Sequence, residues 1–341
     1  MPWPATTWGS ASFAEAETLL RECLELQLKY PPSDHERLLN TKEMLGRTLS
    51  DLKRPDEAEQ FLREALMERR KLMGEDDPHI PWRLTELARV LDNHGRSMEA
   101  LPLYQEALEI AARKIGEDTP SYAVMMNGLA MSLQRVGDLP ASDRTFDRAI
   151  AVARARWGPQ NLGYATMNLN HALLLMRMGR LVEARKKAAE VEQVRAAALA
   201  AHHADLAFAR LALAEIDCES DDPVRARAWL DQFAATVPDA SADLKGLSLA
   251  AESCLARRAG NLDQAIAFLA EADSLIDKAS GYHHPQRLLN ELMRAELLHQ
   301  RNQGNDRADA KAVALAILEA IDSKFVPDAP VRGRLARLIQ P

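Results

Sequence analysis

The chain repeats one sequence pattern at an interval of 42 residues. The pattern is clearest around Glu99-Ala100, Ala107-Leu108 and the segment from Gly116 to Pro120, and related segments lie one interval before and after it. Small residues mark the interval in two series, which are Ala16, Ala58, Ala100, Ser142, Ala184, Ala226 and Ala265, and Gly46, Ala88, Ala130, Ala172, Ala214 and Ser253. A fixed interval of this size is the signature of stacked repeats, in which each unit buries its apolar side against its neighbours. The interval therefore predicts one elongated domain.

Apolar residues spaced by three and four positions predict a helix over 13–29, and two kinds of amphipathic helix alternate after it. The first kind covers 35–52, 78–94, 120–136, 162–178, 203–219, 241–259 and 284–303, and the second kind covers 55–73, 97–115, 139–157, 181–198, 222–236, 262–279 and 306–323. Aromatic residues make up only 5% of the chain, which favours closely packed helices over a sheet. The small residues then lie where two helices approach each other, so both series are predicted core positions.

The two ends of the chain depart from the repeat. Residues 1–12 include two prolines, Pro2 and Pro4, and are predicted to be a flexible tail. The repeats are expected to fill 13–325 as one solenoid. Residues 326–341 are predicted to be a short capping tail, because Pro327 and Pro330 interrupt the last helix and 331–339 has the apolar spacing of a short one.

The composition limits the classes of partner. A formal net charge of −7 argues against a nucleic-acid-binding groove, which needs concentrated Lys and Arg. Three cysteines, Cys23, Cys218 and Cys254, have no close spacing, so the sequence predicts neither a disulfide framework nor a zinc site, and a reducing compartment fits best. No apolar stretch reaches the length of a membrane span. A cytoplasmic protein with no membrane or nucleic-acid partner is expected.

The repeated residues resemble a known family. They are similar to the tetratricopeptide repeats of the long, 42-residue kind found in kinesin light chain and in many bacterial proteins. The segments that carry the resemblance are Met126-Asn127-Gly128-Leu129-Ala130, Glu99-Ala100, Ala107 to Ile110, and Ile115 to Pro120. The resemblance is clear from 13 to about 200 and weaker, though in register, to about 323. It implies an all-α solenoid of antiparallel helix pairs, with about seven repeats and one additional helix at the amino terminus.

That additional helix, 13–29, lacks the partner that the repeat would supply. Its apolar side should then be exposed unless something covers it. Three interpretations remain open: residues 1–10 fold back over it, the chain is the carboxy-terminal part of a longer protein, or the helix associates with a second copy. The oligomeric state is left undetermined by the sequence.

In the resembling family, the first kind of helix lines a concave groove. On each helix of the first kind, the residues three positions before and one position after the small residue share one face, and the residue one turn earlier extends that face. These positions, together with the second Asn of the family motif, provide the candidate groove residues Asn40, Glu43, Arg47, Trp82, Thr85, Arg89, Asn127, Met131, Thr166, Leu169, Asn170, Leu173 and Phe208. Asn127 and Asn170 match motif amides that hold a ligand's peptide backbone, since an amide can both donate and accept a hydrogen bond. Departures from the motif include Gly128 for the second Asn and His171 for a Leu.

Histidine pairs raise the alternative of a metal site. His202-His203 and His283-His284 occupy equivalent loop positions of the repeat, and the second pair matches the family's turn sequence. Asp205 follows the first pair, but no third ligand is near in the sequence, so no metal and no cofactor are expected. No phosphate-binding loop, nucleophile elbow or kinase signature is present.

Two functions follow from these observations. The leading hypothesis is a non-catalytic scaffold whose concave groove binds a peptide or a protein segment. The alternative is the carboxy-terminal sensory or regulatory region of a longer bacterial signalling protein, with an upstream Ser/Thr kinase or transcription-regulator domain. An enzyme in its own right is the least favoured class, because no catalytic motif supports it.

Overall fold

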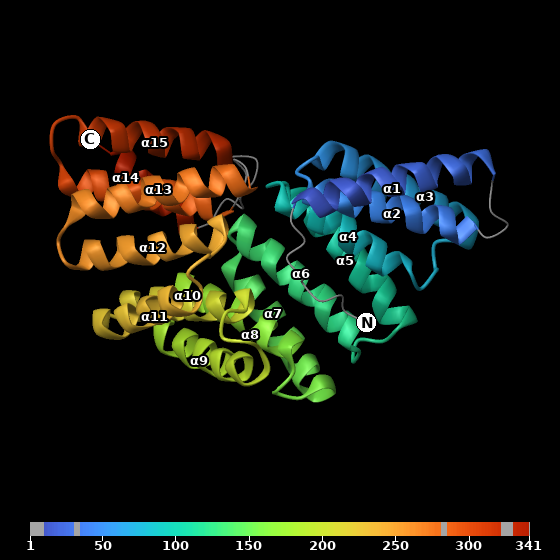
Figure 1. The fold of residues 1–341 in the computed structure, drawn as a ribbon, viewed down its shortest axis with the longest axis horizontal. Helices are drawn as coiled ribbons and strands as arrows, with labels where there is room; N and C mark the ends of the chain where they lie inside the picture. The colour runs from blue at the N-terminus through green and yellow to red at the C-terminus, as the bar shows by residue number, and fades with distance from the viewer. Residues whose placement is uncertain (1–9, 31–34, 281–284, 322–329, 341) are drawn as a thin grey trace. The chain divides into compact units, whose positions relative to one another are not determined.

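The computed structural model describes residues 10–30, 35–280, 285–321 and 330–340, and within them it contains helices and no strand. The helices are α1 (Ser10–Lys29), α2 (His35–Asp51), α3 (Pro55–Met73), α4 (Ile80–Asn93), α5 (Ser97–Lys114), α6 (Pro120–Val136), α7 (Leu139–Trp157), α8 (Leu162–Arg177), α9 (Leu181–Ala198), α10 (Ala204–Glu219), α11 (Pro223–Thr236), α12 (Ala242–Arg258), α13 (Leu262–Ser280), α14 (Pro285–Arg301), α15 (Asp306–Ile321) and α16 (Pro330–Ile339) (Figure 1). The all-α prediction is confirmed.

The chain forms two compact units, unit 1 (Met1–Glu117) and unit 2 (Asp118–Pro341). In unit 1, α2 packs on α3 and α4 packs on α5. In unit 2 the same pairing joins α6 to α7, α8 to α9, α10 to α11, α12 to α13 and α14 to α15 (Figure 1). Each pair is one repeat of the predicted helix hairpin. That residues 13–325 form one continuous solenoid stays a prediction.

Hydrogen bonds at the small positions show that the repeats are equivalent. Ser142 Oγ donates to the backbone oxygen of Ala130 at 2.7 Å, and Ser253 Oγ donates to that of Ala265 at 2.8 Å. In both cases a small residue of one helix reaches the small residue of its partner, 12 positions away in the sequence. All four residues are buried. The prediction that both series lie in the core is confirmed for these positions.

Arginines join one repeat to the next. Arg54, Arg96 and Arg180 each stand immediately before a helix of the second kind. Each guanidinium pairs with a Glu three residues later and with a carboxylate 37 residues earlier, which gives the pairs Arg54 with Glu57 and Glu17, Arg96 with Glu99 and Glu59, and Arg180 with Glu183 and Asp143. The arginines are partly exposed, so each bridge contributes modestly to stability.

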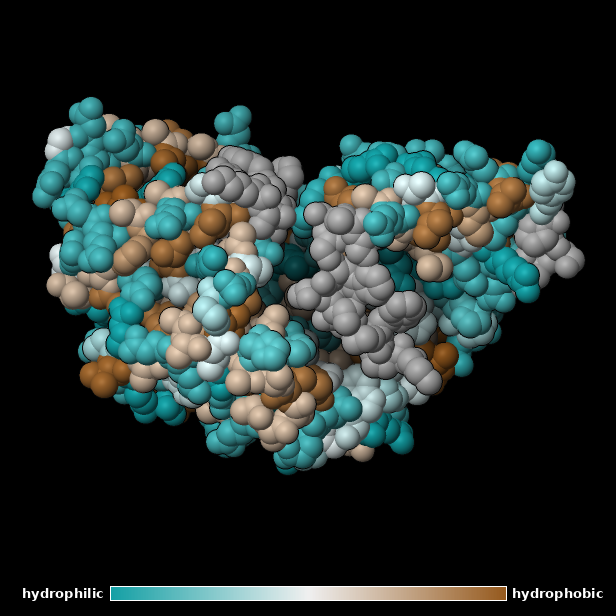
Figure 2. All heavy atoms as spheres, viewed as in Figure 1, coloured by the Kyte–Doolittle hydropathy of each residue, from teal (hydrophilic) through white to brown (hydrophobic). Residues whose placement is uncertain are grey.

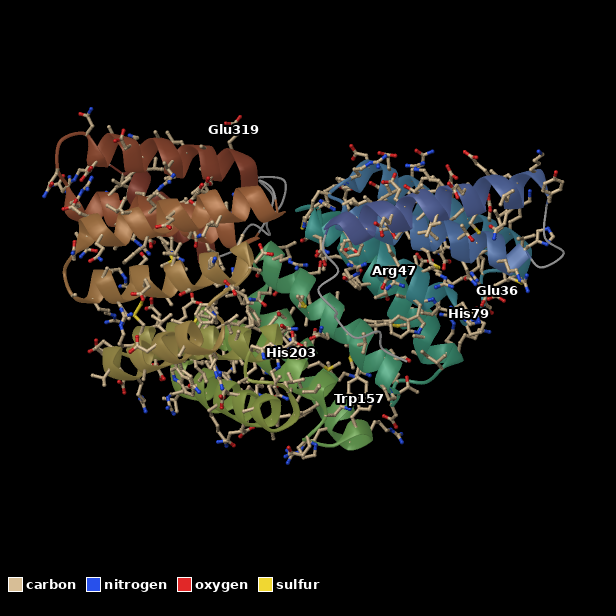
Figure 3. The ribbon with its side chains drawn as sticks, in the orientation of Figure 1. Glu36, Arg47, His79, Trp157, His203 and Glu319 are labelled. Atoms are coloured by element: carbon tan, nitrogen blue, oxygen red, sulfur yellow. A yellow bond between two sulfur atoms is a disulfide. The ribbon has the colours of Figure 1, made fainter. Side chains whose placement is uncertain are left out.

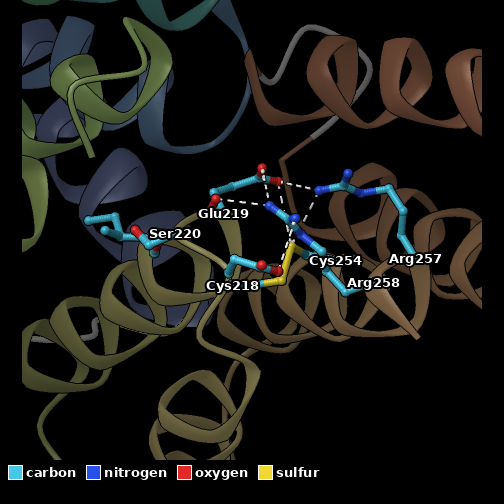
Figure 4. The surroundings of a disulfide bond; sticks show 8 residues. Cys218, Glu219, Ser220, Cys254, Arg257 and Arg258 are labelled. Atoms are coloured by element: carbon cyan, nitrogen blue, oxygen red, sulfur yellow. Dashed lines mark hydrogen bonds and ion pairs between the residues drawn. A yellow bond between two sulfur atoms is a disulfide. The ribbon is translucent and has the colours of Figure 1, made fainter. Parts of the chain in front are cut away.

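A disulfide joins Cys218 at the end of α10 to Cys254 in α12, with their Cα atoms 6.4 Å apart (Figure 4). The prediction that no disulfide forms was therefore wrong. The two cysteines are 36 residues apart in the sequence, but α10 packs directly on α12, because helices of the same kind are neighbours in a stack. The inference of a reducing compartment loses its support, while Cys23 remains a free thiol.

Helix α1 carries the exposed apolar side chains that its missing partner predicts. Leu19, Leu26 and Leu28 are 65%, 60% and 59% exposed. In the space-filling view, hydrophobic patches interrupt the mainly hydrophilic surface of unit 1 (Figure 2). The helix begins at Ser10, three residues earlier than expected, since no proline stands between Pro4 and the end of the helix. The rest of the predicted amino-terminal tail, residues 1–9, lies outside the described residues.

A short helix, α16 (Pro330–Ile339), lies in the carboxy-terminal segment, and the extent of the cap over 326–341 stays a prediction. Leu335 and Leu338 are buried against α14 and α15. The proline-containing break before it, within 322–329, lies outside the described residues. No helix in the described segments combines the length and the apolar character needed to cross a membrane.

Candidate functional site

The candidate groove residues are distributed over both units, so they form two surfaces that are described separately. The first, called the α2–α4 face, consists of Asn40, Glu43, Arg47, Trp82, Thr85 and Arg89 in unit 1. The second, called the α6–α8 face, consists of Asn127, Met131, Thr166, Leu169, Asn170 and Leu173 in unit 2, with Phe208 on the neighbouring α10.

Ion pairs within unit 1 occupy most charges of the α2–α4 face. Arg83 of α4 pairs with Glu43 and donates to Asn40 Oδ1 at 3.2 Å. Glu86 accepts a hydrogen bond from Arg89 at 2.9 Å and lies 3.4 Å from Arg47 Nε. The charged groups of the α2–α4 face are therefore largely paired with their own neighbours.

Burial further limits what the α2–α4 face can offer a ligand. Glu43 is 6% exposed, and burial raises the pKa of its carboxyl group to about 7 although Arg83, Arg69 and Arg47 oppose the shift. Thr85 is buried and its hydroxyl donates to the backbone oxygen of Pro81 at 2.8 Å. Trp82 is half-buried. A ligand on this face would meet Asn40, Arg47, Arg89 and part of Trp82 rather than all six residues.

The α6–α8 face brings the two predicted amides together. Asn170 Nδ2 donates to Asn127 Oδ1 at 3.2 Å, and it lies 3.5 Å from Met131 Sδ. Asn127 Nδ2 lies 3.7 Å from the same sulfur, which is a weak acceptor. Among the described residues, no donor reaches Asn170 Oδ1. Asn170 Oδ1 therefore remains as a strong acceptor and Asn127 Nδ2 as a weakly engaged donor. The hydrogen bond between the two amides holds both side chains in place.

Apolar residues lie beside the amide pair. Leu169 is 1% exposed and belongs to the core of α8, α9 and α10, so it supports the α6–α8 face from below instead of contacting a ligand. Leu173 and Phe208 are half-buried and pack against the same core. Thr166 is exposed, but its hydroxyl donates to the backbone oxygen of Leu162 at 2.9 Å and accepts from Arg195 at 3.1 Å.

The first histidine pair has a structural role in its loop. His203 Nδ1 accepts a hydrogen bond from the backbone N–H of Asp205 at 3.1 Å, which makes His203 the N-cap of α10 (Figure 3). A side-chain acceptor at this position satisfies one of the free N–H groups at the start of a helix. His202 is exposed. His283 and His284 lie outside the described residues.

A cluster that the sequence did not reveal lies on α7 and α8. Asp143, Asp147 and His171 place one ligand-type atom each within 4.8 Å of one another. The two aspartates are 28 and 24 positions from His171 in the sequence, so the 42-residue interval does not relate them. The signal available was the substitution itself, because His171 stands where the resembling motif has Leu. The cluster borders a cleft of about 800 Å³ lined by Asp147, Tyr164, Asn168, Lys187 and Glu190.

Comparison with known proteins identifies the repeats. Residues 10–66 and 69–155 match the family model of the tetratricopeptide repeat, so the chain contains tetratricopeptide repeats, as the sequence predicts. A search of curated protein sequences found no match.

Solved structures share the fold at low sequence identity. BtubC (BKLC) from P. vanneervenii is 21% identical, with a TM-score of 0.55, over 67% of this chain and 89% of that one. The apo form of RapI is 11% identical, with a TM-score of 0.63, over 84% and 99%. The Rap conjugation gene regulator of plasmid pLS20, in complex with the Phr* peptide, is 10% identical, with a TM-score of 0.63, over 92% and 86%. At these identities the likeness concerns the fold alone.

Proposed function

We propose that this chain is a non-catalytic scaffold that binds an extended peptide or protein segment on the α6–α8 face. The observation that carries the proposal is the hydrogen-bonded pair of Asn127 and Asn170. A peptide backbone presents a C=O acceptor and an N–H donor at each residue. Asn127 Nδ2 can donate to the former and Asn170 Oδ1 can accept from the latter. Because each amide holds the other, little side-chain freedom is lost on binding.

Neighbouring side chains support a ligand with an apolar residue beside the bound backbone. Leu173 and Phe208 are half-buried next to the core of α8, α9 and α10, and each retains some exposed apolar surface. Met131 adds a flexible thioether, which adapts to ligands of different shape. A pocket wall of this kind, with few polar groups that fix orientation, is typical of peptide sites. The Rap structure in complex with the Phr* peptide supports the proposal by its fold.

The α2–α4 face is the weaker candidate within the same proposal. Most of its charges are already paired, so a ligand would have to break ion pairs or bind around them. Arg47, Arg89 and Trp82 remain accessible for side-chain contacts. We therefore expect substitutions on this face to change ligand affinity less than substitutions at Asn127 or Asn170.

Selection from a random peptide library followed by fluorescence polarisation would test the proposal. Asn170→Ala should weaken a selected peptide at least fivefold, since one hydrogen bond contributes about 1 kcal/mol. Gln193→Ala is the matched control, because Gln193 is an exposed amide on α9 of the same unit, and it should leave affinity unchanged. A library that yields no binder, or binders indifferent to Asn170→Ala and Asn127→Ala, would refute the assignment.

A second proposal is that these repeats regulate a longer signalling protein that includes a kinase or transcription-regulator domain. The exposed leucines of α1 favour it, because a preceding helix could cover them. Reading the genomic DNA upstream of the codon for Met1 would test it. An in-frame stop codon directly upstream would exclude it.

A further inference from the structure

His171 is held by contacts that leave one of its two ring nitrogens unused. The ring is 1% exposed and stacks on Phe146 with centroids 5.4 Å apart. Nε2 lies 2.6 Å from Asp143 Oδ1, and the other oxygen of Asp143 accepts from Arg180 at 2.7 Å. Both oxygens of Asp143 are thus engaged. A 2.6 Å separation is a hydrogen bond with no room for an ion between the atoms.

The second ring nitrogen, Nδ1, is buried and has no hydrogen-bond partner among the described residues. A buried polar atom left unpaired costs about 1–3 kcal/mol, so its presence calls for an explanation. Asp147 Oδ1 lies 3.7 Å from Nδ1, which is too far for a hydrogen bond. The Asp147 side chain is 68% exposed and lines the cleft of about 800 Å³. The unpaired nitrogen of a buried imidazole therefore lies 3.7 Å from a carboxylate that borders solvent.

We propose that His171 Nδ1 and the Asp147 carboxylate bind a divalent transition-metal cation of the zinc class, with the cleft supplying the remaining coordination positions. An ion about 2.0–2.2 Å from each atom can bridge ligand atoms up to about 4.2 Å apart, and the observed 3.7 Å lies within that limit. Asp143 then acts as the carboxylate that orients the imidazole through Nε2–H, as in carboxylate–histidine–zinc arrangements. Mg²⁺ and Ca²⁺ are disfavoured because they require oxygen ligands.

The surrounding charges set how tightly such an ion would bind. Because Nε2 is hydrogen-bonded to Asp143 and Nδ1 has no hydrogen-bond partner among the described residues, Nδ1 is the ring nitrogen available to a metal. Lys187 Nζ donates to Asn168 Oδ1 at 3.3 Å in the same cleft. Its positive charge opposes a bound cation, whereas Glu190 in the same cleft favours one. Removing the charge of Lys187 should consequently strengthen binding.

Isothermal titration of the full chain, free of any histidine tag, with ZnCl2 is the primary test. We expect one site per chain, and Asp147→Asn should weaken it at least tenfold. Glu190→Gln is the matched control in the same cleft and should change affinity less than threefold. Lys187→Gln should strengthen binding at least threefold. Co²⁺ in place of Zn²⁺ should give visible absorption bands that Asp147→Asn removes.

His171→Gln should abolish the site, but it also alters a buried position. Asp147→Asn avoids that difficulty because Asp147 is exposed, so the proposal stays testable if the His171 variant does not fold. Absence of stoichiometric binding would overturn the proposal. Binding that persists in Asp147→Asn would also overturn it and would direct attention to His202 and His203. Neither result would affect the proposed peptide site on the α6–α8 face.

Discussion

Replacing Gly46 by alanine should separate α2 from α3 and destabilise unit 1. A Cβ atom at this position would lie 2.8 Å from Leu62 Cγ and 3.1 Å from the backbone oxygen of Ala58. Leu62 is 3% exposed and Ala58 is completely buried, so neither atom is the free end of a flexible side chain. The two helices must move apart, and the neighbouring core contacts of Leu45 and Leu49 loosen with them.

Two opposing terms set the size of the effect. Ala is more favourable than Gly in a helix interior by about 1 kcal/mol. Overpacking a core costs about 1–3 kcal/mol, and this site belongs at the upper end because the contacts are with a branch carbon and a backbone atom. The net loss is about 2 kcal/mol, which is roughly a thirtyfold change in the folding equilibrium.

Urea denaturation followed by circular dichroism would measure the loss, and hydrogen exchange would locate it in α2 and α3. Gly333→Ala is the matched control, because Gly333 lies in α16 and a Cβ atom added to it would have no neighbouring atom within 4 Å. That variant should be neutral or stabilised by up to about 1 kcal/mol. Leu62→Ala should be less costly in the Gly46→Ala background than in the wild type, since it removes the clash. A stabilised Gly46→Ala variant, or strictly additive changes, would refute the reasoning.

Three further predictions concern other parts of the chain. Reducing the Cys218–Cys254 disulfide, or replacing Cys254 by serine, should cost about 3–4 kcal/mol from the entropy of the loop, given the 36-residue separation, and faster hydrogen exchange in α10 and α12 would report it. Burial and the nearby Glu219 raise the pKa of Glu215 from 4.5 to about 7. The stabilisation from its protonation is present below pH 4.5 and lost as pH rises through 7, so Glu215→Gln should flatten the stability profile in that window. Arg180→Ala should lower stability by only about 0.5 kcal/mol in thermal denaturation, because its side chain is 39% exposed.

The repeat interval predicted the helices and their pairing because residues one interval apart occupy the same place in successive helix pairs. Once Ala130 was assigned to a helix crossing, the same role followed for every residue one interval away. The two serine hydrogen bonds, from Ser142 and from Ser253, show that even a polar substitution at the small position keeps its geometry. Packing of this kind is local, so it can be read from the sequence.

The candidate site was less predictable, because it depends on side chains that differ from repeat to repeat, and the interval does not specify how such side chains contact each other. Asn127 and Asn170 were both predicted from the family motif, but the motif does not indicate that they hydrogen-bond to each other across 43 positions. The 36-residue disulfide has the same origin. Thr85 and Glu43 were placed on the correct helices, but their burial depends on the length of the side chains beside them, which the pattern of small residues does not specify.

Departures from the repeat pattern carry information that the pattern cannot. A leucine at position 171 would bring no polar atom into the interior, whereas histidine leaves Nδ1 buried without a hydrogen-bond partner among the described residues. Asp143 satisfies only the other ring nitrogen, Nε2, and is itself held by Arg180. A cation between His171 and Asp147 would satisfy the remaining nitrogen, which gives the substitution a physical reason. The amide pair differs, because Asn170 is only half-buried, so water can satisfy its Oδ1 and the N–H of the proposed ligand would replace that water.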